Sequence, residues 1–117
     1  MEKVLVVDDE IDICVLLSRH LQKHGAKAEY ALNLSDAIDM AYNGHYNLYI
    51  IDLNLAGRSG YELVEKLKEM DRTAKIIMIS AHDSEAENAI QKGADYFIAK
   101  PLSKKAINHA LEQIHFT

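Results

Sequence analysis

Charged and polar side chains follow apolar segments of the sequence at four separate places. They are Asp8, Asp9 and Glu10, then Asp52, then Ser80, and finally Lys100, which precedes the only proline, Pro101. Two carboxylates about 4 Å apart repel by roughly 4 kcal/mol at an effective dielectric constant near 20, so a site that gathers several of them needs cations. Lys100 and a hard divalent ion would supply that charge, and oxygen ligands with retained water favour Mg²⁺. These residue types are the ones that metal-assisted phosphoryl transfer requires.

Parallel β-strands would bring these distant side chains to one edge of a sheet. Short β-branched apolar runs alternate with helical patterns along the chain, which is typical of repeated βα units. We expect strands at Lys3–Val7, Lys27–Ala31, Asn47–Ile51, Lys75–Ile79 and Asp95–Ile98. The first and fourth are continuously apolar and suit central strands, whereas the second and fifth suit edges. A ligand site in such an open sheet lies beyond the carboxyl ends of the strands, where all the residues above are expected.

Helices are expected between and after these strands. The first should run from about Asp9 to His24, with an inward stripe of Ile13, Leu17 and Leu21 and with Cys14 beside it. The others begin at or after capping candidates, which are in order Ser35, Gly60, Ser84 with Glu87, and Ser103. Glycines mark three expected helix ends, at Gly25, Gly44 and Gly93. The fold class is therefore α/β, with helices on both faces of a mainly parallel sheet.

Composition limits the classes of function. The 117 residues suffice for one domain, which we expect to span residues 1–117. The net charge of −5 argues against a surface of its own for nucleic acid or anionic membrane. The single cysteine cannot form an internal disulfide, so a reducing, cytoplasmic location is expected. The apolar run near the N-terminus is too short for a signal peptide or a membrane span, and we expect neither there.

The combination of motifs resembles one known family along the entire chain. The N-terminal VLVVDDE, Asp52 followed by Gly60, the Ser80–Ala81 pair and Lys100–Pro101 are similar in order and spacing to the receiver domain of two-component response regulators, the CheY-like family. The resemblance implies a doubly wound, three-layer α/β/α fold with five strands in the flavodoxin-like order 2-1-3-4-5. Any one of these motifs alone would be weak, because a lone Asp after a strand is often only a helix cap.

The resemblance implies a phosphoacceptor and a metal site. Asp52 matches the phosphoacceptor, whose carboxylate attacks the phosphorus of a phosphohistidine and forms an acyl phosphate. Asp9 matches the main metal-binding acid and Asp8 its partner. The backbone carbonyl of Asn54, together with Asp52 itself, would complete the Mg²⁺ shell.

The resemblance also implies a switch. Ser80 matches the hydroxyl that bonds the phosphoryl group, and Lys100 matches the ammonium that pairs with it. Phe97 matches an aromatic residue that changes rotamer when Ser80 moves, with a plain core position as the alternative. The Lys100–Pro101 peptide bond is expected to be cis.

By this resemblance the chain is a signalling switch in a two-component phosphorelay and not an enzyme in the usual sense, since it catalyses only its own Mg²⁺-dependent phosphorylation and dephosphorylation. The donor would be a sensor histidine kinase or a histidine phosphotransfer protein. The face formed by the fourth helix, the fifth strand and the fifth helix would act on a downstream effector protein or on a missing output domain. A stand-alone protein and a piece of a larger regulator both fit the sequence. We expect no direct nucleic-acid binding and no membrane partner.

Three positions near the site invite specific hypotheses. Leu55-Ala56-Gly57 stands where many receivers have Met-Pro-Gly, so Ala56 should leave this loop less constrained in φ than proline would. Ser59 stands where Asp is common, with no obvious chemical cost. His82, two residues after Ser80, is hypothesised to tune the lifetime of the acyl phosphate.

The alternative function is a Mg²⁺-dependent aspartyl phosphatase of the haloacid-dehalogenase type. That chemistry needs a second acid two residues after the nucleophile, where this chain has Asn54. A flavodoxin-like FMN carrier would share the topology, but its phosphate would meet Asp8, Asp9 and Glu10, which repel it. The sequence contains no GxxxxGK phosphate-binding loop.

Overall fold

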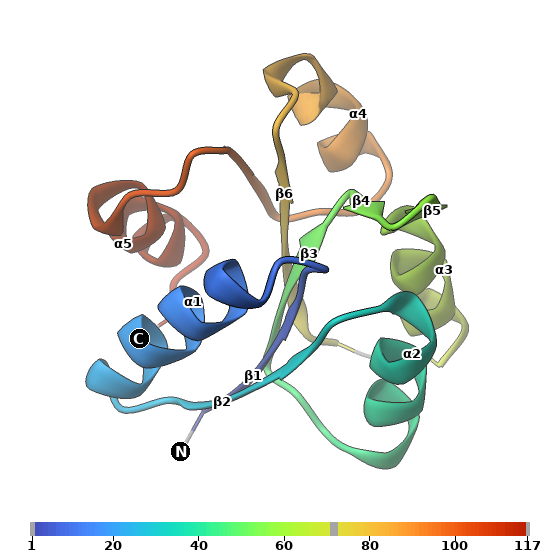
Figure 1. Cartoon of the computed structure of the whole chain (residues 1–117), viewed down its shortest axis with the longest axis horizontal. Coiled ribbons are helices and arrows are strands. Elements are labelled where there is room, and N and C mark those ends of the chain that lie inside the picture. Colours follow the sequence, from blue (N-terminus) through green and yellow to red (C-terminus); the bar gives the residue numbers. More distant parts are fainter. Residues whose placement is uncertain (1, 71–72, 117) are drawn as a thin grey trace.

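Alternating strands and helices build a three-layer structure (Figure 1). The computed structural model describes residues 2–70 and 73–116. The strands are β1 (Lys3–Val7), β2 (Lys27–Ala31), β3 (Leu48–Asp52), β4 (Asn54–Leu55), β5 (Arg58–Ser59), β6 (Lys75–Ser80) and β7 (Tyr96–Ala99). The helices are α1 (Ile11–Lys23), α2 (Leu34–Asn43), α3 (Tyr61–Glu69), α4 (Ala86–Gln91) and α5 (Lys104–Gln113), and a 3₁₀ turn, η1 (Asp83–Glu85), precedes α4.

The central sheet has five parallel strands in the order β2-β1-β3-β6-β7. This order corresponds to the expected 2-1-3-4-5, and the expected edge strands, β2 and β7, do lie at the edges. Side chains of β1 alternate between the two faces, so Val4 and Val6 join one core cluster while Leu5 and Val7 join the other. Both faces are covered by helices, which is why this strand is apolar throughout. The expected α/β class and topology are confirmed.

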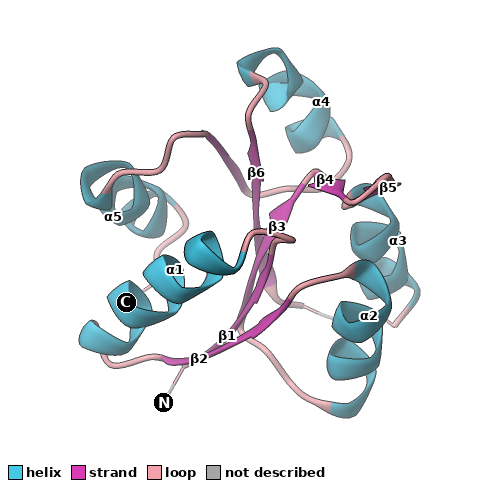
Figure 2. Ribbon diagram, in the orientation of Figure 1, coloured by secondary structure: helices cyan, strands magenta, loops and turns pink. Residues whose placement is uncertain are grey.

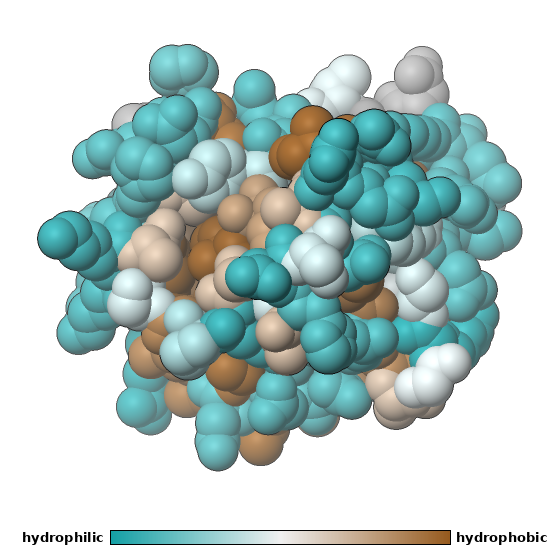
Figure 3. Space-filling view, turned by 90° about the horizontal axis from the view of Figure 1, so that it is seen from above, coloured by the Kyte–Doolittle hydropathy of each residue, from teal (hydrophilic) through white to brown (hydrophobic). Residues whose placement is uncertain are grey.

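The helices are divided between the two faces of the sheet (Figure 2). Buried residues of α1 and α5 form one core cluster with the sheet, and buried residues of α2, α3 and α4 form the other. In the space-filling view from above Figure 1, on the side of α4, hydrophilic side chains cover most of the face and apolar ones gather toward its middle (Figure 3). Within residues 2–70 and 73–116, no helix is long and apolar enough to cross a membrane.

Most helix boundaries follow the expected signals. Helix α3 begins directly after Gly60, and Ser103 caps α5 by accepting a 3.1 Å hydrogen bond from the Ala106 N–H. Gly25 and Gly93 end their helices with positive φ angles of 88° and 119°, which favour glycine. Gly44 ends α2 in an extended conformation.

Two expected helix starts were wrong. Helix α2 is capped by Asn33, whose Oδ1 accepts a 2.8 Å hydrogen bond from the Asp36 N–H, so Ser35 lies inside the first turn. Ser84 does not cap the fourth helix. It lies in the 3₁₀ turn η1, and α4 begins later, without a side-chain cap.

The first helix also starts later than expected. Glu10 is extended, with φ −95° and ψ 109°, and its N–H donates a 2.9 Å hydrogen bond to Asp8 Oδ1. This local turn holds the acidic residues outside α1, which begins at Ile11. Leu17 and Leu21 of the expected stripe are buried, but Cys14 is fully buried in place of Ile13, which is only half-buried.

Candidate functional site

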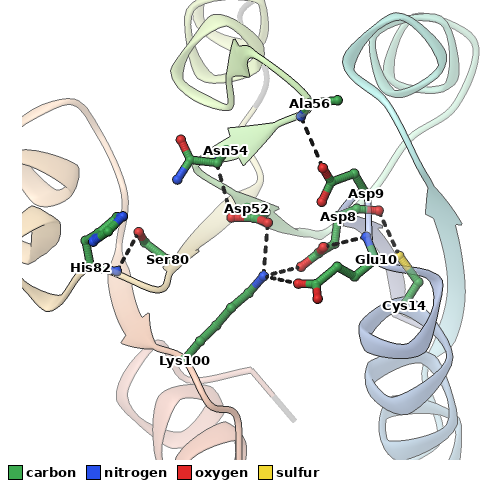
Figure 4. A network of polar contacts seen from close by, with 10 residues as sticks. All are labelled: Asp8, Asp9, Glu10, Cys14, Asp52, Asn54, Ala56, Ser80, His82 and Lys100. Carbon is green, nitrogen blue, oxygen red and sulfur yellow. Dashed lines mark hydrogen bonds and ion pairs between the residues drawn. The ribbon is translucent and has the colours of Figure 1, made fainter.

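The carboxyl ends of the parallel strands carry the side chains that the sequence singled out (Figure 4). Asp8 follows β1, Asp52 ends β3, Ser80 ends β6, and Lys100 follows β7. Because β1, β3 and β6 are adjacent in the sheet, these residues come together although they lie far apart in the sequence. The Lys100–Pro101 peptide bond is cis.

Lys100 is the centre of an ionic network. Its Nζ lies 3.1 Å from Asp8 Oδ2, 2.9 Å from Glu10 Oε2 and 3.0 Å from Asp52 Oδ2. Burial lowers the pKa of the ammonium, but its hydrogen bonds to the three carboxylates outweigh that effect and hold the pKa above its usual range. Lys100 therefore stays charged at neutral pH and offsets part of the negative charge around it.

Asp8 is the most deeply buried acid of this network. Its side chain is fully buried, and burial raises the pKa of its carboxyl to about 6, although the Glu10 N–H lowers it. The negative charge of Asp52 raises the pKa further, and the Lys100 ammonium opposes this effect. Apart from its 3.1 Å ion pair with the Lys100 ammonium, Oδ2 has no hydrogen-bond partner within the described residues. A buried carboxylate with an unfilled acceptor site is suited to bind a further cation.

The acidic cluster fits a hard metal ion. Among the residues that the structure describes, one group can place a carboxylate oxygen from each member within 4.8 Å of the others, and it comprises Asp8, Asp9, Glu10 and Asp52. All its potential ligands are oxygens, and two of them are exposed to solvent, which leaves room for metal-bound water. This donor set fits Mg²⁺ better than zinc or copper.

A small hairpin positions the exposed acid Asp9. Strands β4 and β5 pair antiparallel, and the two turn residues Ala56 and Gly57 have positive φ angles of 49° and 86°. This is the geometry of a type I′ turn. The Ala56 N–H donates a 3.1 Å hydrogen bond to Asp9 Oδ2. The segment is thus a paired hairpin in which Ala56 adopts a φ angle that proline could not.

The end of β3 is held by a close backbone approach. The Gly60 N–H donates a 2.7 Å hydrogen bond to the Leu53 carbonyl. A Cβ atom on Gly60 would overlap the Asp52 carbonyl oxygen and would lie 2.9 Å from Ile51 Cγ2. Only glycine therefore fits between α3 and the end of β3.

Each oxygen of Asp52 has its own donor. The Asn54 N–H donates a 3.2 Å hydrogen bond to Oδ1, and Lys100 donates to Oδ2. The residue is only 4% exposed, so its carboxylate is largely shielded from solvent. The turn from Asp8 to Glu10 is also held from the core, because the fully buried Cys14 thiol donates a 3.3 Å hydrogen bond to the Asp8 carbonyl. Burial raises the pKa of the Cys14 thiol to about 12, so it is not a nucleophile.

The family of the chain follows from a match to a family model. The model of the response regulator receiver domain matches residues 4–112. The chain belongs to this family. Its polar network at the strand ends is therefore the acidic site of a receiver domain.

Solved structures of similar proteins agree with this assignment. The chain has 29% sequence identity to the response regulator TrrA of Thermotoga maritima, with a TM-score of 0.86 and coverage of 97% of this chain and 99% of the other. It has 25% identity to the chemotaxis protein CheY4 of Vibrio cholerae, with a TM-score of 0.88 and coverage of 97% and 98%. The TrrA structure is a complex with Mg²⁺ and BeF.

A response regulator protein of Burkholderia pseudomallei is also similar. Its crystal structure holds a phosphorylated aspartic acid, a calcium ion and citrate. Identity is 28% and the TM-score is 0.85, over 95% of this chain but only 66% of the Burkholderia chain. This receiver domain thus spans slightly less than two thirds of that relative.

The two predicted switch residues, Ser80 and Phe97, stand apart from the acidic network. Ser80 is fully buried, and its Oγ accepts a 3.1 Å hydrogen bond from the His82 N–H instead of bonding Lys100. Figure 4 shows both residues to one side of the carboxylates. Phe97 is half-buried and packs against the core cluster of α2, α3 and α4. The structure therefore unites the acids with Lys100 and leaves Ser80 and Phe97 outside that cluster.

Sequence reasoning missed two parts of the site. Glu10 was noted among the acids but received no role, yet it makes the shortest contact to Lys100. The β4–β5 hairpin was not expected, because Gly57 alone is a weak turn signal. Asn-Gly or Asp-Gly would have been the common form of that turn, and alanine concealed it.

Proposed function

We propose that Asp52 is the phosphoacceptor of this receiver domain and that it accepts a phosphoryl group from a phosphohistidine. The donor would be a sensor histidine kinase or a histidine phosphotransfer protein. The observation that carries the proposal is the 3.0 Å hydrogen bond from Lys100 Nζ to Asp52 Oδ2 beside the acidic cluster. The phosphorylated aspartic acid in the Burkholderia relative supports the same chemistry.

In the proposed reaction, an Asp52 carboxylate oxygen attacks the phosphorus atom of the donor. A new oxygen–phosphorus bond forms while the phosphorus–nitrogen bond breaks, and the imidazole leaves with the electron pair of that bond. The Asn54 N–H and the Lys100 ammonium hold the carboxylate before the donor arrives, so little orientation remains to be achieved. As negative charge gathers on the phosphoryl oxygens, Lys100 can exchange a carboxylate partner for one of them.

The acids would hold the metal that this transfer requires. Asp8, Asp9, Asp52 and the Asn54 backbone carbonyl are the proposed ligands of Mg²⁺, which supplies positive charge to the phosphoryl oxygens when it is bound. The complex of TrrA with Mg²⁺ and BeF supports this choice of ion. Asp9 is exposed, so its carboxylate can turn from the Ala56 N–H toward a metal ion without any change in the core.

Phosphorylation would act on Ser80 and Phe97. A doubly charged phosphoryl group on Asp52 attracts hydrogen-bond donors, and the Ser80 hydroxyl is the donor at the end of the neighbouring strand. When Ser80 turns toward the phosphoryl group, Phe97 on β7 would change its rotamer. The face of α4, β7 and α5 would then bind a downstream effector protein or an output domain.

In this proposal the receiver domain catalyses only its own phosphorylation and dephosphorylation, and it does not act on other substrates. A cytoplasmic location is part of the same proposal, because the single cysteine is buried and unpaired as in a reducing compartment. We do not include nucleic acid or membrane among its partners, since the net charge is −5.

Incubation with acetyl phosphate and Mg²⁺, followed by measurement of the intact mass, tests the proposal. One phosphoryl adduct is expected on the wild-type chain, and it should be lost under alkali. Asp52→Asn should remain unmodified, whereas Asp39→Asn, which changes an exposed acid on α2, should be modified like the wild type. An unmodified wild-type chain with this donor and with a phosphorylated histidine kinase would refute the proposed function.

A further inference from the structure

Tyr61 connects the acceptor strand to the segment that follows Ser80. It is the first residue of α3 and directly follows Gly60, whose backbone is bonded to Leu53 at the end of the acceptor strand. The Tyr61 N–H donates a 3.2 Å hydrogen bond to Ser59 Oγ. The backbone of Tyr61 is therefore fixed with respect to Asp52.

The side chain of Tyr61 reaches the beginning of α4. Its hydroxyl donates a 3.3 Å hydrogen bond to Glu85 Oε1 and accepts a 3.3 Å hydrogen bond from Asn88 Nδ2. Asn88 Nδ2 also lies 3.5 Å from Glu85 Oε1, which closes a triangle of three polar side chains. All three residues are half-buried, so these bonds are partly shielded from water. We call these residues the Tyr61 cluster.

A second contact binds the same two helices further along. Lys92 Nζ lies over the Tyr61 ring, 5.4 Å from its centroid, at a distance typical of a cation–π interaction. Lys68 of α3 donates a 2.9 Å hydrogen bond to the Lys92 carbonyl at the end of α4. Helix α4 has only six residues and no side-chain cap, so these contacts supply polar restraint that its own sequence lacks.

The Tyr61 cluster is connected to Ser80 by a short segment of the chain. Only residues 81 and 82 separate Ser80 from η1, which ends at Glu85. Ser80 Oγ is bonded to the His82 N–H, so the hydroxyl is tied to the same segment. A movement of Ser80 toward Asp52 therefore pulls on residues 81–85, and Tyr61 holds the far end of that segment.

We propose that the Tyr61 hydroxyl is a positioning group that holds residues 81–85 in the unphosphorylated arrangement and thereby opposes the switch. This inference rests on the proposed function of Asp52 and Ser80. Hydrogen bonds made in one of two states stabilise that state alone, so removal of the hydroxyl shifts the equilibrium toward the other. Tyr61→Phe deletes the hydroxyl and keeps the ring that packs beside Lys92.

The first measurement needs no phosphoryl chemistry. Hydrogen exchange of the backbone amides of residues 81–86 should be faster in Tyr61→Phe than in the wild type. The matched control is Tyr30→Phe, which deletes an exposed hydroxyl on the edge strand β2, away from α4. Unchanged exchange in residues 81–86 would overturn the proposal, because the hydroxyl would then restrain nothing.

The second measurement is the apparent affinity for beryllofluoride in saturating Mg²⁺, determined by calorimetric titration. Tyr61→Phe should bind about threefold to tenfold more tightly, which is the change expected when one or two partly buried hydrogen bonds no longer stabilise the free state. Asn88→Ala, which removes a donor to the same hydroxyl, should change the affinity in the same direction. Tyr30→Phe should bind like the wild type.

The outcomes separate this inference from the proposed function. If the wild type binds and Tyr61→Phe binds equally or more weakly, Tyr61 is merely a packing residue and the positioning role is refuted, while the role of Asp52 stands. A lower melting temperature with unchanged affinity has the same meaning. If the wild-type chain does not bind beryllofluoride at all, both proposals fail.

Discussion

Lys100 Nζ donates a 3.0 Å hydrogen bond to Asp52 Oδ2, although 48 positions of sequence separate the two residues. The same ammonium contacts Asp8 and Glu10 of the first strand end. One cation thus joins the ends of three strands and is the main counter-charge of the site. Its loss would leave two buried carboxylates, Asp8 and Asp52, without a cation beside them.

Lys100→Met should therefore lower both stability and phosphorylation. Removal of one partner from a buried ion pair costs about 3 kcal/mol of unfolding free energy, and the acidic neighbours repel one another once the ammonium is gone. Urea denaturation without divalent ions measures the loss, and acetyl phosphate labelling measures the rate. Lys105→Met, on the exposed side of α5, is the control. A loss below 1 kcal/mol together with a normal labelling rate would argue against the central role of Lys100.

The raised pKa of Asp8 predicts an unusual pH dependence of stability. Its pKa is about 6 in the folded state and 3.8 ordinarily, so between these values the folded chain binds a proton that the unfolded chain has released. Stability without metal therefore falls as the pH rises from about 4 to 6, and the ionised group costs about 3 kcal/mol at pH 7. Protonation of Asp8 below pH 4 in both states removes this cost.

The variant Asp8→Asn tests the direction of this pH dependence. The variant should be more stable than the wild type at pH 7 in metal-free buffer, and the advantage should shrink as the pH approaches 4. Urea midpoints at several pH values give the comparison, with Asp39→Asn as an exposed control. A variant that is less stable than the wild type at pH 7 would show that Asp8 is a net stabilising charge, contrary to its burial.

The hairpin turn provides a third prediction. Ala56 has a φ angle of 49°, which costs roughly 1 kcal/mol for a residue with a Cβ atom. Ala56→Gly should raise the unfolding free energy by about this amount, because glycine adopts the angle freely and keeps the N–H that bonds Asp9. Chemical denaturation measures the gain.

Ala56→Pro should have the opposite effect. Proline fixes φ near −65° and has no N–H, so it breaks the turn and the hydrogen bond to Asp9. Stability and Mg²⁺ affinity should both fall. Equal stability of the glycine and proline variants would contradict the left-handed turn.

The His82 hypothesis gives a fourth prediction. The His82 N–H is bonded to Ser80, and its exposed side chain lines a hollow of about 380 Å³ next to Leu53 and Asn54. The imidazole can therefore hinder the approach of water to a phosphoryl group on Asp52. His82→Ala should shorten the half-life of the acyl phosphate about twofold to fivefold, since it opens the site to water. The half-life is obtained from the loss of the phosphoryl group over time, measured by intact mass. Identical half-lives in His82→Ala and the wild type would contradict the hypothesis.

Strand positions were predictable to within one residue because they depend on local sequence, although β3, β6 and β7 each end one residue later than expected. A continuously apolar strand such as β1 fits only between two helical layers, so its bounds and its central place follow from its composition. Parallel neighbours then carry Asp8 and Asp52 to the same edge. Helix starts were less predictable where two capping residues compete, since Asn33 and Ser35 are both good caps and only the reach of Asn33 to Asp36 decides between them.

Long-range pairing and unusual backbone angles were beyond local reasoning. The contact of Glu10 with Lys100 joins residues 90 positions apart and depends on how a flexible side chain folds back over the site. Ala56 has an angle that alanine rarely adopts, so no propensity scale indicates it. The contact of Tyr61 with α4 likewise depends on the packing of two helices and not on a motif.

Location of the modified residue tests the central claim most directly. After phosphorylation with acetyl phosphate and Mg²⁺, borohydride reduces an aspartyl phosphate to homoserine, and peptide mass spectrometry then locates the changed residue. We predict homoserine at position 52 alone, and none in the Asp52→Asn variant treated in the same way. Homoserine at Asp8 or Asp9, or no conversion in a chain that has gained a phosphoryl group, would contradict the assignment of Asp52 as the acceptor.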